Sequence, residues 1–351
     1  MISKKTKIRS KRRSRKSRKS GTYPHYPFYR NDYKLIPMKL KIISARIPSQ
    51  LNIYQSPPNK QFPGYKLPIK RLDIQGSQNG YYVIRSKWDD NLELNSLTDY
   101  FTEPCRVKCT FKNRMAPLEY WQLHHKDLTA SLKRQHLPET GYNYREEMYK
   151  RNKPCNNFRI SVCLEVLRLF KPNSWLDISA GWGDRLLSAL LSTTVQTYTA
   201  CDPNDCLHPY YKEMIKTFDP EQKKKITMIQ DGFETAILPA NQKYDLAFSS
   251  PPFFDLEIYS KTAADSLVKY NTSQKWFNGF LMPAIYKAVE YLNPDGYLVL
   301  YMGESQNTQY IPEMIRLTDS IKGVRNAGMF YYTDGAKLRE FYCWRKKLPK
   351  S

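Results

Sequence analysis

A glycine-rich turn at 177–183, with the sequence Asp-Ile-Ser-Ala-Gly-Trp-Gly, separates an apolar segment at 174–178 from a predicted helix at 185–191. Glycine allows a tight turn and lets the backbone approach a ligand closely, and the first turn of the following helix offers unpaired amide groups. Strand-like and helix-like segments keep alternating after this turn. The alternation predicts a parallel sheet with helices on both faces, which is the doubly wound α/β architecture.

The further predicted elements are identified by their apolar spacing. Strands are expected at 196–201, 226–230, 244–248 and 296–302, a final antiparallel hairpin at 327–332 and 340–344, and helices at 157–170, 209–217 and 273–292. We place this catalytic domain at 140–351. Residues 22–139 are expected to form a mixed accessory region that recognises nucleic acid, with strands at 80–85 and 105–111 and helices at 127–134 and 144–151.

The chain is strongly basic, with a formal net charge of +23 over 351 residues, and eleven of these charges fall within the first twenty residues. Residues 1–21 are a Lys/Arg/Ser tail that we expect to be disordered and to act as a binding arm or an address. Because neutralised phosphates release counterions, this composition favours a nucleic-acid partner. No apolar run is long enough to predict a membrane span. The sequence leaves the oligomeric state open.

Seven cysteines form no regular framework, and no signal-peptide pattern opens the chain. We therefore expect a reducing, intracellular location, in the nucleus or the cytoplasm. Cys105 and Cys109 with His124 and His125 could suggest zinc, but their spacing favours a structural role, and no metal is expected. Cys155 follows a proline, as the nucleophile does in some enzymes, but it precedes the glycine turn, so we expect it to pack in the core.

Three aspartates end successive predicted strands. Asp177 begins the glycine turn, Asp202 follows the next strand nineteen residues after Gly183, and Asp231 follows the third. A carboxylate at the second position can bind both hydroxyls of a ribose, and one at the third position can meet an adenine amino group. Each could instead cap a turn. The predicted cofactor-binding residues are Asp177, Ser179, Ala180, Gly181, Gly183, Asp202, Asp231, Gly232 and, before the turn, Phe158.

The turn does not match the usual nucleotide-binding patterns. It lacks the Gly-Lys-Ser/Thr ending that binds ATP phosphates, and Leu186 stands where the third glycine of a dinucleotide-binding turn would be. S-adenosylmethionine is therefore the expected cofactor.

A second motif, Ser250-Pro251-Pro252-Phe253, follows the apolar segment at 244–248. With the glycine turn, it resembles the amino methyltransferases that act on N6 of adenine or N4 of cytosine in DNA. The longer strings at 249–259 and 179–185 are similar to those of DNA methylases of large DNA viruses and phages. The resemblance covers roughly 140–345. Ser250 stands where the adenine enzymes more often carry Asp or Asn, and the chain after Met302 is too short for a large recognition domain.

The resemblance implies a class I methyltransferase fold and direct methyl transfer from S-adenosylmethionine to an amino group of a DNA base. Ser250 and the carbonyl of Pro251 would accept hydrogen bonds from the amine, Pro252 would stiffen the turn and Phe253 would stack on a flipped-out base. RNA as the substrate shares every motif. A protein that has lost activity and only binds nucleic acid is the non-enzymatic alternative. Tyr120, Trp121, His124 and Lys126 form a further candidate surface for nucleic acid.

Overall fold

The computed structural model describes residues 25–32, 49–87, 92–111, 114–254, 257–259, 265–304, 308–335 and 337–348. The basic tail predicted at 1–21 lies outside these residues. Among the described helices, none is both long enough and apolar enough to cross a membrane.

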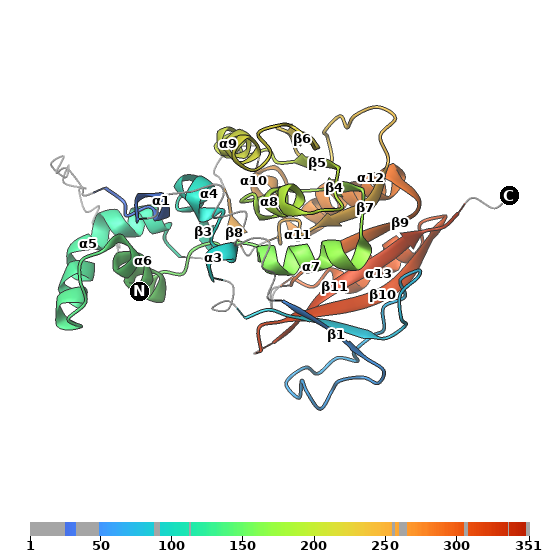
Figure 1. Ribbon diagram of the computed structural model, residues 1–351, viewed down its shortest axis with the longest axis horizontal. Coiled ribbons are helices and arrows are strands. Elements are labelled where there is room, and N and C mark those ends of the chain that lie inside the picture. The colour runs from blue at the N-terminus through green and yellow to red at the C-terminus, as the bar shows by residue number, and fades with distance from the viewer. Residues whose placement is uncertain are drawn as a thin grey trace, which may run out of the picture.

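One nine-stranded sheet organises the chain, in the order β1-β2-β10-β11-β9-β7-β4-β5-β6 (Figure 1). Neighbouring strands from β9 to β6 pair in parallel, whereas β11 runs antiparallel to both β9 and β10. This arrangement confirms the predicted doubly wound α/β fold and its terminal hairpin. The strands are β1 (Gln50–Tyr54), β2 (Tyr81–Arg85), β4 (Ser174–Asp177), β5 (Thr197–Cys201), β6 (Lys225–Ile229), β7 (Tyr244–Ser249), β9 (Leu292–Tyr301), β10 (Val324–Thr333) and β11 (Leu338–Lys346).

Both faces of the sheet are buried because successive strand residues point to opposite sides. Trp175 and Phe248 belong to one hydrophobic cluster, and their neighbours Leu176 and Ala247 belong to another. The first cluster includes residues of α7 (Ile160–Phe170), α8 (Asp184–Leu191) and α9 (His208–Phe218). The second includes residues of α11 (Ser273–Trp276), the π-helix η2 (Phe277–Leu281), α12 (Met282–Tyr291) and α13 (Ile311–Asp319).

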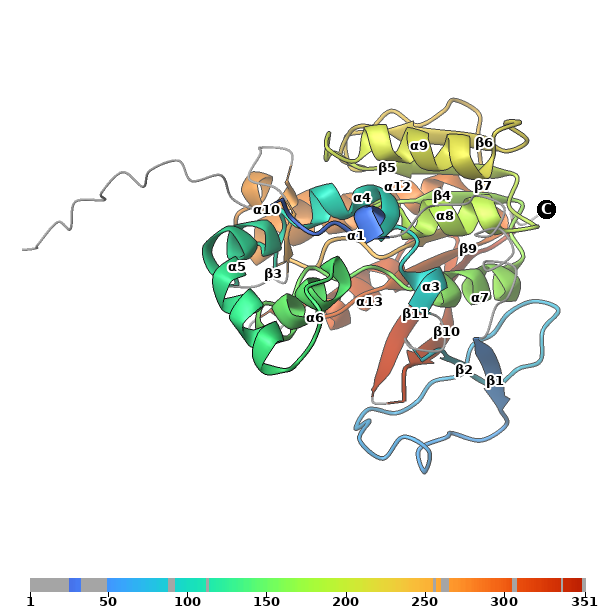
Figure 2. The ribbon, with the colours of Figure 1, turned by 60° about the vertical axis from the view of Figure 1, so that its left-hand side comes forward.

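The segment before residue 140 contributes to the same sheet. β2 pairs in parallel with β10, and β1 pairs antiparallel with β2. The boundary predicted between 139 and 140 stays a prediction, but strands from both sides of it share one sheet. The short helix α1 (Tyr29–Asp32) lies next to α4 (Asp99–Arg106) and α6 (Gly141–Arg151), whereas α3 (Leu92–Asn95) lies next to α7 (Figures 1 and 2). Helices α5 (Pro117–Arg134) and α6 pack together and project away from the sheet in both ribbon views.

Two predicted elements differ from the structure. The strand expected at 105–111 is instead the end of α4 and the two-residue strand β3 (Thr110–Phe111), which pairs with β8 (Glu257–Ile258). Alternating apolar residues there are buried by loop packing and not by a sheet. The helix expected at 273–292 is interrupted by η2 because Pro283, at the start of α12, has no amide proton for the helical hydrogen bond. A short helix, α10 (Ser266–Lys269), precedes it.

Candidate active site

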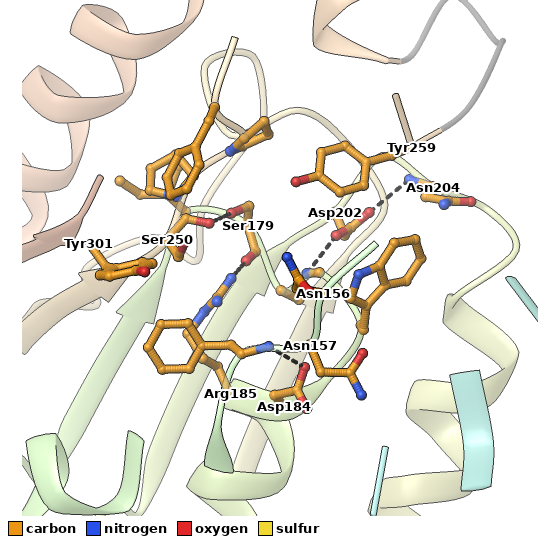
Figure 3. A pocket seen from close by; sticks show the side chains of 18 of the residues that line it. Asn156, Asn157, Ser179, Asp184, Arg185, Asp202, Asn204, Ser250, Tyr259 and Tyr301 are labelled. Carbon is orange, nitrogen blue, oxygen red and sulfur yellow. Dashed lines mark hydrogen bonds between the residues drawn. The ribbon is translucent and has the colours of Figure 1, made fainter. Parts of the chain in front are cut away.

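A pocket of about 690 Å³ lies beyond the carboxyl ends of β4, β5 and β7 (Figure 3). This is the side of a doubly wound sheet on which ligands bind. Most of the predicted site residues line it together, namely Phe158, Ser179, Ala180, Gly181, Asp202, Gly232, Ser250, Pro251, Pro252 and Phe253. Asp177, Gly183 and Asp231 are not among the lining residues.

Asp177 lies beneath the glycine turn and is fully buried. One carboxylate oxygen accepts hydrogen bonds from the Ser249 hydroxyl at 2.7 Å and the Ser179 amide at 3.2 Å. The other accepts from Arg185 Nε at 2.8 Å and from the Tyr198 hydroxyl at 2.8 Å. With its carboxylate engaged in this way, Asp177 holds β4, β5, β7 and α8 together and positions the turn from below.

The two glycines of the turn, Gly181 and Gly183, have different structural roles. Gly181 has a φ of +60° and its amide donates to Asp202 Oδ2 at 2.8 Å, so it shapes the floor of the pocket. Gly183 has a φ of +92°, and a side-chain carbon there would lie 2.8 Å from Met214 of α9. The positive φ favours glycine at 183, whereas the flexible end of the Met214 side chain can move aside. Sequence alone cannot separate this backbone role from ligand contact.

Asp202 is one of the buried carboxylates that line the pocket. It accepts hydrogen bonds from the amides of Gly181 at 2.8 Å and Asn204 at 3.0 Å. Burial raises the pKa of this carboxyl to about 6, and the two amides oppose the shift. Because a carboxylate can accept more than two hydrogen bonds, Asp202 retains capacity for a ligand hydroxyl.

Glu234 lines the pocket where the sequence suggests Asp231. Asp231 Oδ1 accepts from the Gly232 amide at 2.7 Å and the Thr235 hydroxyl at 3.0 Å, so it stabilises its own exposed turn. Glu234 lines the pocket with its side chain only 7% exposed, and its Oε1 pairs with Lys269 at 2.8 Å. Its Oε2 is buried and has no hydrogen-bond partner among the described residues. A single sequence offers no signal that separates two acidic residues three positions apart in one turn.

A second unpaired acceptor comes from the segment before α7. The side-chain amide of Asn157 donates to Asp99 Oδ1 at 2.9 Å and to Thr98 Oγ1 at 3.2 Å, which fixes its orientation. The other amide atom, Oδ1, is buried and has no partner among the described residues. Asn157 lines the pocket beside Asp184, whose Oδ2 accepts from the Phe158 amide at 3.2 Å (Figure 3).

The glycine turn and the Ser-Pro-Pro-Phe turn are joined directly. The Ser179 hydroxyl donates to the Ser250 carbonyl at 3.1 Å (Figure 3). Aromatic rings extend the pocket beyond this contact. The Tyr301 ring lies 5.9 Å from that of Phe253 and 5.6 Å from that of Phe158, measured between centroids. Tyr301 ends β9, and no motif in the sequence marks it.

Four of the seven cysteines form disulfides. Cys105 pairs with Cys206 and Cys109 pairs with Cys155, while Cys163, Cys201 and Cys343 are free and buried. The expectation that the cysteines form no framework is wrong, because these pairs connect residues 101 and 46 positions apart, which spacing cannot reveal. Both bonds start in the segment just after or within α4. One reaches the loop that follows Asp202, and the other reaches the segment that precedes Asn157. The predicted intracellular location stays a prediction.

We expect reduction of these two bonds by dithiothreitol to destabilise the protein. Each should contribute about 2 to 4 kcal/mol to the free energy of unfolding, chiefly by restricting the unfolded chain. Urea denaturation with and without the reductant measures the difference. The double variant Cys105→Ser/Cys206→Ser should respond only to loss of the remaining bond, and equal unfolding midpoints for the oxidised and reduced wild type would contradict the expectation.

The aromatic surface predicted on α5 is not formed as expected. Trp121 is 4% exposed and packs with Tyr26, Leu128 and Met148 in a small core beneath the helix. Helical periodicity brings Trp121 to the inner face, so it is unavailable to stack on a base. Tyr120 and His124, whose ring centroids are 4.5 Å apart, remain partly accessible.

No family model and no curated protein matches the chain. Solved structures with partial likeness include TrmN from Thermus thermophilus, at 16% identity and a TM-score of 0.38 over 54% of this chain and 49% of that one. A methyltransferase from Pyrococcus furiosus has 15% identity and a TM-score of 0.37 over 54% of this chain and 84% of that one. An rRNA methylase from Streptococcus thermophilus has 11% identity and a TM-score of 0.36, over 54% and 96%. The chain thus spans about half of TrmN.

Proposed function

We propose that this protein is an S-adenosylmethionine-dependent methyltransferase that acts on an exocyclic amino group of a nucleic-acid base, with DNA as the first substrate to test. The observation that carries the proposal is the contact between Ser179 and Ser250. It brings the turn suited to a cofactor and the turn suited to an amine into one pocket. A donor and an acceptor held side by side in this way need only a short transfer path.

The acceptors of the pocket match the donors of S-adenosylmethionine. This cofactor carries an adenine amino group, two ribose hydroxyls and an α-ammonium group. Within the part of the chain that the structure describes, Glu234 Oε2 and Asn157 Oδ1 are buried acceptors without partners, and Asp202 lies among the lining residues contributed by the strand ends. Because an unpaired buried acceptor is costly, a ligand that supplies donors at these positions would be favoured. The bound cofactor would supply a sulfonium methyl group. The nitrogen lone pair would attack its carbon, so that a C–N bond forms as the C–S bond breaks, S-adenosylhomocysteine leaves and the methylated amine releases a proton to solvent.

The residues of the second turn would hold the target amine. The Ser250 carbonyl already accepts from Ser179, so we assign the Ser250 hydroxyl and the Pro251 carbonyl to the amine. Accepting the amine protons draws the nitrogen lone pair out of conjugation with the ring and toward the methyl donor. Phe253 and Tyr301 offer aromatic faces for the base.

The decisive experiment is mass spectrometry of nucleosides from DNA and RNA incubated with the enzyme and methyl-labelled S-adenosylmethionine. Labelled N4-methylcytosine or N6-methyladenine from DNA supports the proposal in full. Labelled product from RNA alone assigns the substrate to RNA. If neither yields product while the protein binds both cofactor and nucleic acid, methyl transfer to bases is excluded and a binding role is left.

We expect Asp202→Ala to weaken S-adenosylmethionine binding by about 1.5 to 3 kcal/mol, because charge-assisted hydrogen bonds to two hydroxyls are lost. In the wild type, the raised pKa of about 6 means that affinity should fall as the pH drops below 6, since the protonated carboxyl is a poorer acceptor. Calorimetry from pH 5 to 8 measures both effects. The Asp202→Asn variant should lose this pH dependence, and an unchanged dissociation constant in folded Asp202→Ala would remove Asp202 from the site.

Glu234→Ala and Asp231→Ala form a matched pair in the same turn. We expect Glu234→Ala to weaken cofactor binding by about 1 to 2 kcal/mol through loss of an acceptor, and Asp231→Ala to leave the affinity nearly unchanged. Isothermal titration of both variants with S-adenosylmethionine makes the comparison. A larger loss of affinity in Asp231→Ala than in Glu234→Ala would assign the cofactor contact to Asp231, as predicted from the sequence.

A further inference from the structure

Two arginines, one tyrosine and one aspartate form a charged cluster at one end of the pocket. Arg159 precedes α7, Tyr332 is on β10, Asp334 lies in the turn after β10 and Arg339 is on β11, and all four line the pocket. The guanidinium carbons of Arg159 and Arg339 lie 5.2 and 5.0 Å from the centroid of the Tyr332 ring. Both arginines contact Asp334 Oδ2, at 3.3 and 3.1 Å.

Among the described residues, the cluster joins two guanidinium groups to the carboxylate of Asp334. Two guanidinium groups share a single carboxylate oxygen. Arg159 is further held by a hydrogen bond of 2.6 Å from its Nη1 to the carbonyl of Ser86, just after β2. Arg339 Nη1 is buried and has no hydrogen-bond partner among the described residues. A buried guanidinium donor without a partner is costly, and an anion entering the pocket would satisfy it.

The cluster belongs to the target side of the pocket. In the sheet, β9, β7 and β4 lie between the strands that carry Tyr332 and Arg339 and the strand that leads to Asp202. The Ser-Pro-Pro-Phe turn follows β7, so it lies between the two groups. Tyr301, whose ring is 5.9 Å from Phe253, belongs to β9 next to β11. An anion bound by Arg339 would therefore be on the opposite side of the Ser-Pro-Pro-Phe turn from Asp202.

Phosphate is the anion that fits these groups and this chain. A guanidinium presents two parallel donors that match phosphate oxygens, and stacking on a tyrosine keeps its edge available. The net charge of +23 favours a polyanion over a neutral partner.

We propose that Arg339, supported by Arg159, binds a backbone phosphate next to the nucleotide whose base enters the pocket. This inference rests on the proposed function, and it adds a strand-positioning site to the base pocket. The hairpin of β10 and β11 would then orient the nucleic-acid strand. The segment before residue 140 would contribute as well, because the Ser86 carbonyl after β2 holds Arg159 in place.

Binding of a short fluorescent oligonucleotide, at several salt concentrations, tests the proposal in the full-length protein. Arg339→Ala should weaken binding about 5- to 30-fold and make the slope of log K against log salt shallower by about 0.7 to 0.9, the contribution of one phosphate. Arg339→Lys should restore part of the affinity. Arg316→Ala removes a matched exposed arginine on α13 that pairs with Glu313 at 2.7 Å, and it should leave both quantities unchanged.

Neutral methylphosphonate linkages, placed one at a time in the oligonucleotide, identify the phosphate without relying on the fold of a variant. Wild-type affinity should fall at one position beside the target, and at that position Arg339→Ala should show no additional loss. An unchanged salt slope in Arg339→Ala overturns the inference. Weaker S-adenosylmethionine binding by Arg339→Ala also overturns it, because that result would assign Arg339 to the cofactor carboxylate. A third contrary result is an acidic peptide that competes with the oligonucleotide and binds with the same affinity. Failure of the proposed function is seen separately, as absence of labelled nucleoside with the wild type.

Discussion

Replacing Asp177 with alanine is expected to lower the free energy of unfolding by about 3 to 5 kcal/mol, because it leaves a buried arginine without its counter-charge. Arg185 is only 5% exposed and its Nε lies 2.8 Å from the Asp177 carboxylate. The same substitution removes the acceptor of the Tyr198 and Ser249 hydroxyls. Urea denaturation gives the difference directly.

Two further variants make this result specific. Asp127→Ala removes an aspartate whose side chain is 71% exposed on α5, and it should change stability by less than about 0.5 kcal/mol. Asp177→Asn retains an acceptor oxygen and the size of the side chain but loses the charge. Its loss of stability should therefore lie between those of Asp177→Ala and Asp127→Ala. A loss below about 1 kcal/mol in Asp177→Ala would mean that Arg185 finds another partner.

Ser250→Ala is expected to lower the rate of methyl transfer by about 10²-fold or more while leaving S-adenosylmethionine affinity unchanged, because one positioned polar group is lost at the reacting centre. Phe253→Ala should act differently. It removes stacking worth about 1 to 3 kcal/mol on the base, so its defect should include weaker substrate binding. Single-turnover rates with labelled cofactor, together with oligonucleotide affinities, separate the two effects.

Ser320→Ala provides the matched control, since this exposed serine only donates to the Leu317 carbonyl at the end of α13. Its transfer rate should equal that of the wild type. Wild-type rates in both Ser250→Ala and Phe253→Ala would defeat the role proposed for the Ser-Pro-Pro-Phe turn. A loss of cofactor affinity in Ser250→Ala, matching the loss of rate, would place the serine on the cofactor instead of the amine.

The regular core was predictable because local patterns determine it. Alternation of apolar strands and helices identified β4 to β7, β9 to β11 and the helices α7, α8, α9 and α12, with ends displaced by only a few residues. It did not mark β8, α10 or α13. The prediction failed where the pattern had another cause. The alternating residues near Cys105 and Cys109 are buried by the end of α4 and by two disulfides, and the long helix breaks at η2 before Pro283.

The candidate site was predictable in its motifs and not in its individual contacts. Glycine at 181 and serine at 250 could be named because backbone conformation and chain order limit what such turns do. The roles of Asp177 and Asp231 could not be predicted, since an aspartate at a strand end can bind either a ligand or the protein itself. The role of Gly183 could not be predicted because a glycine in such a turn can serve the backbone conformation or a ligand. The structure places Asp177 among Arg185, Tyr198 and Ser249, outside the pocket lining.

By itself, the sequence determined the order of strands and helices, the two turns that follow β4 and β7, and the basic charge, because these depend on residues close together in the chain. Only the tertiary structure decided which distant groups meet. It alone brings Arg159 and Arg339 onto Tyr332 and buries Glu234 Oε2 where no other described residue offers it a hydrogen bond. Such contacts depend on how the strands are ordered within the sheet and on which distant side chains pack together, and neither leaves a local signature in the chain.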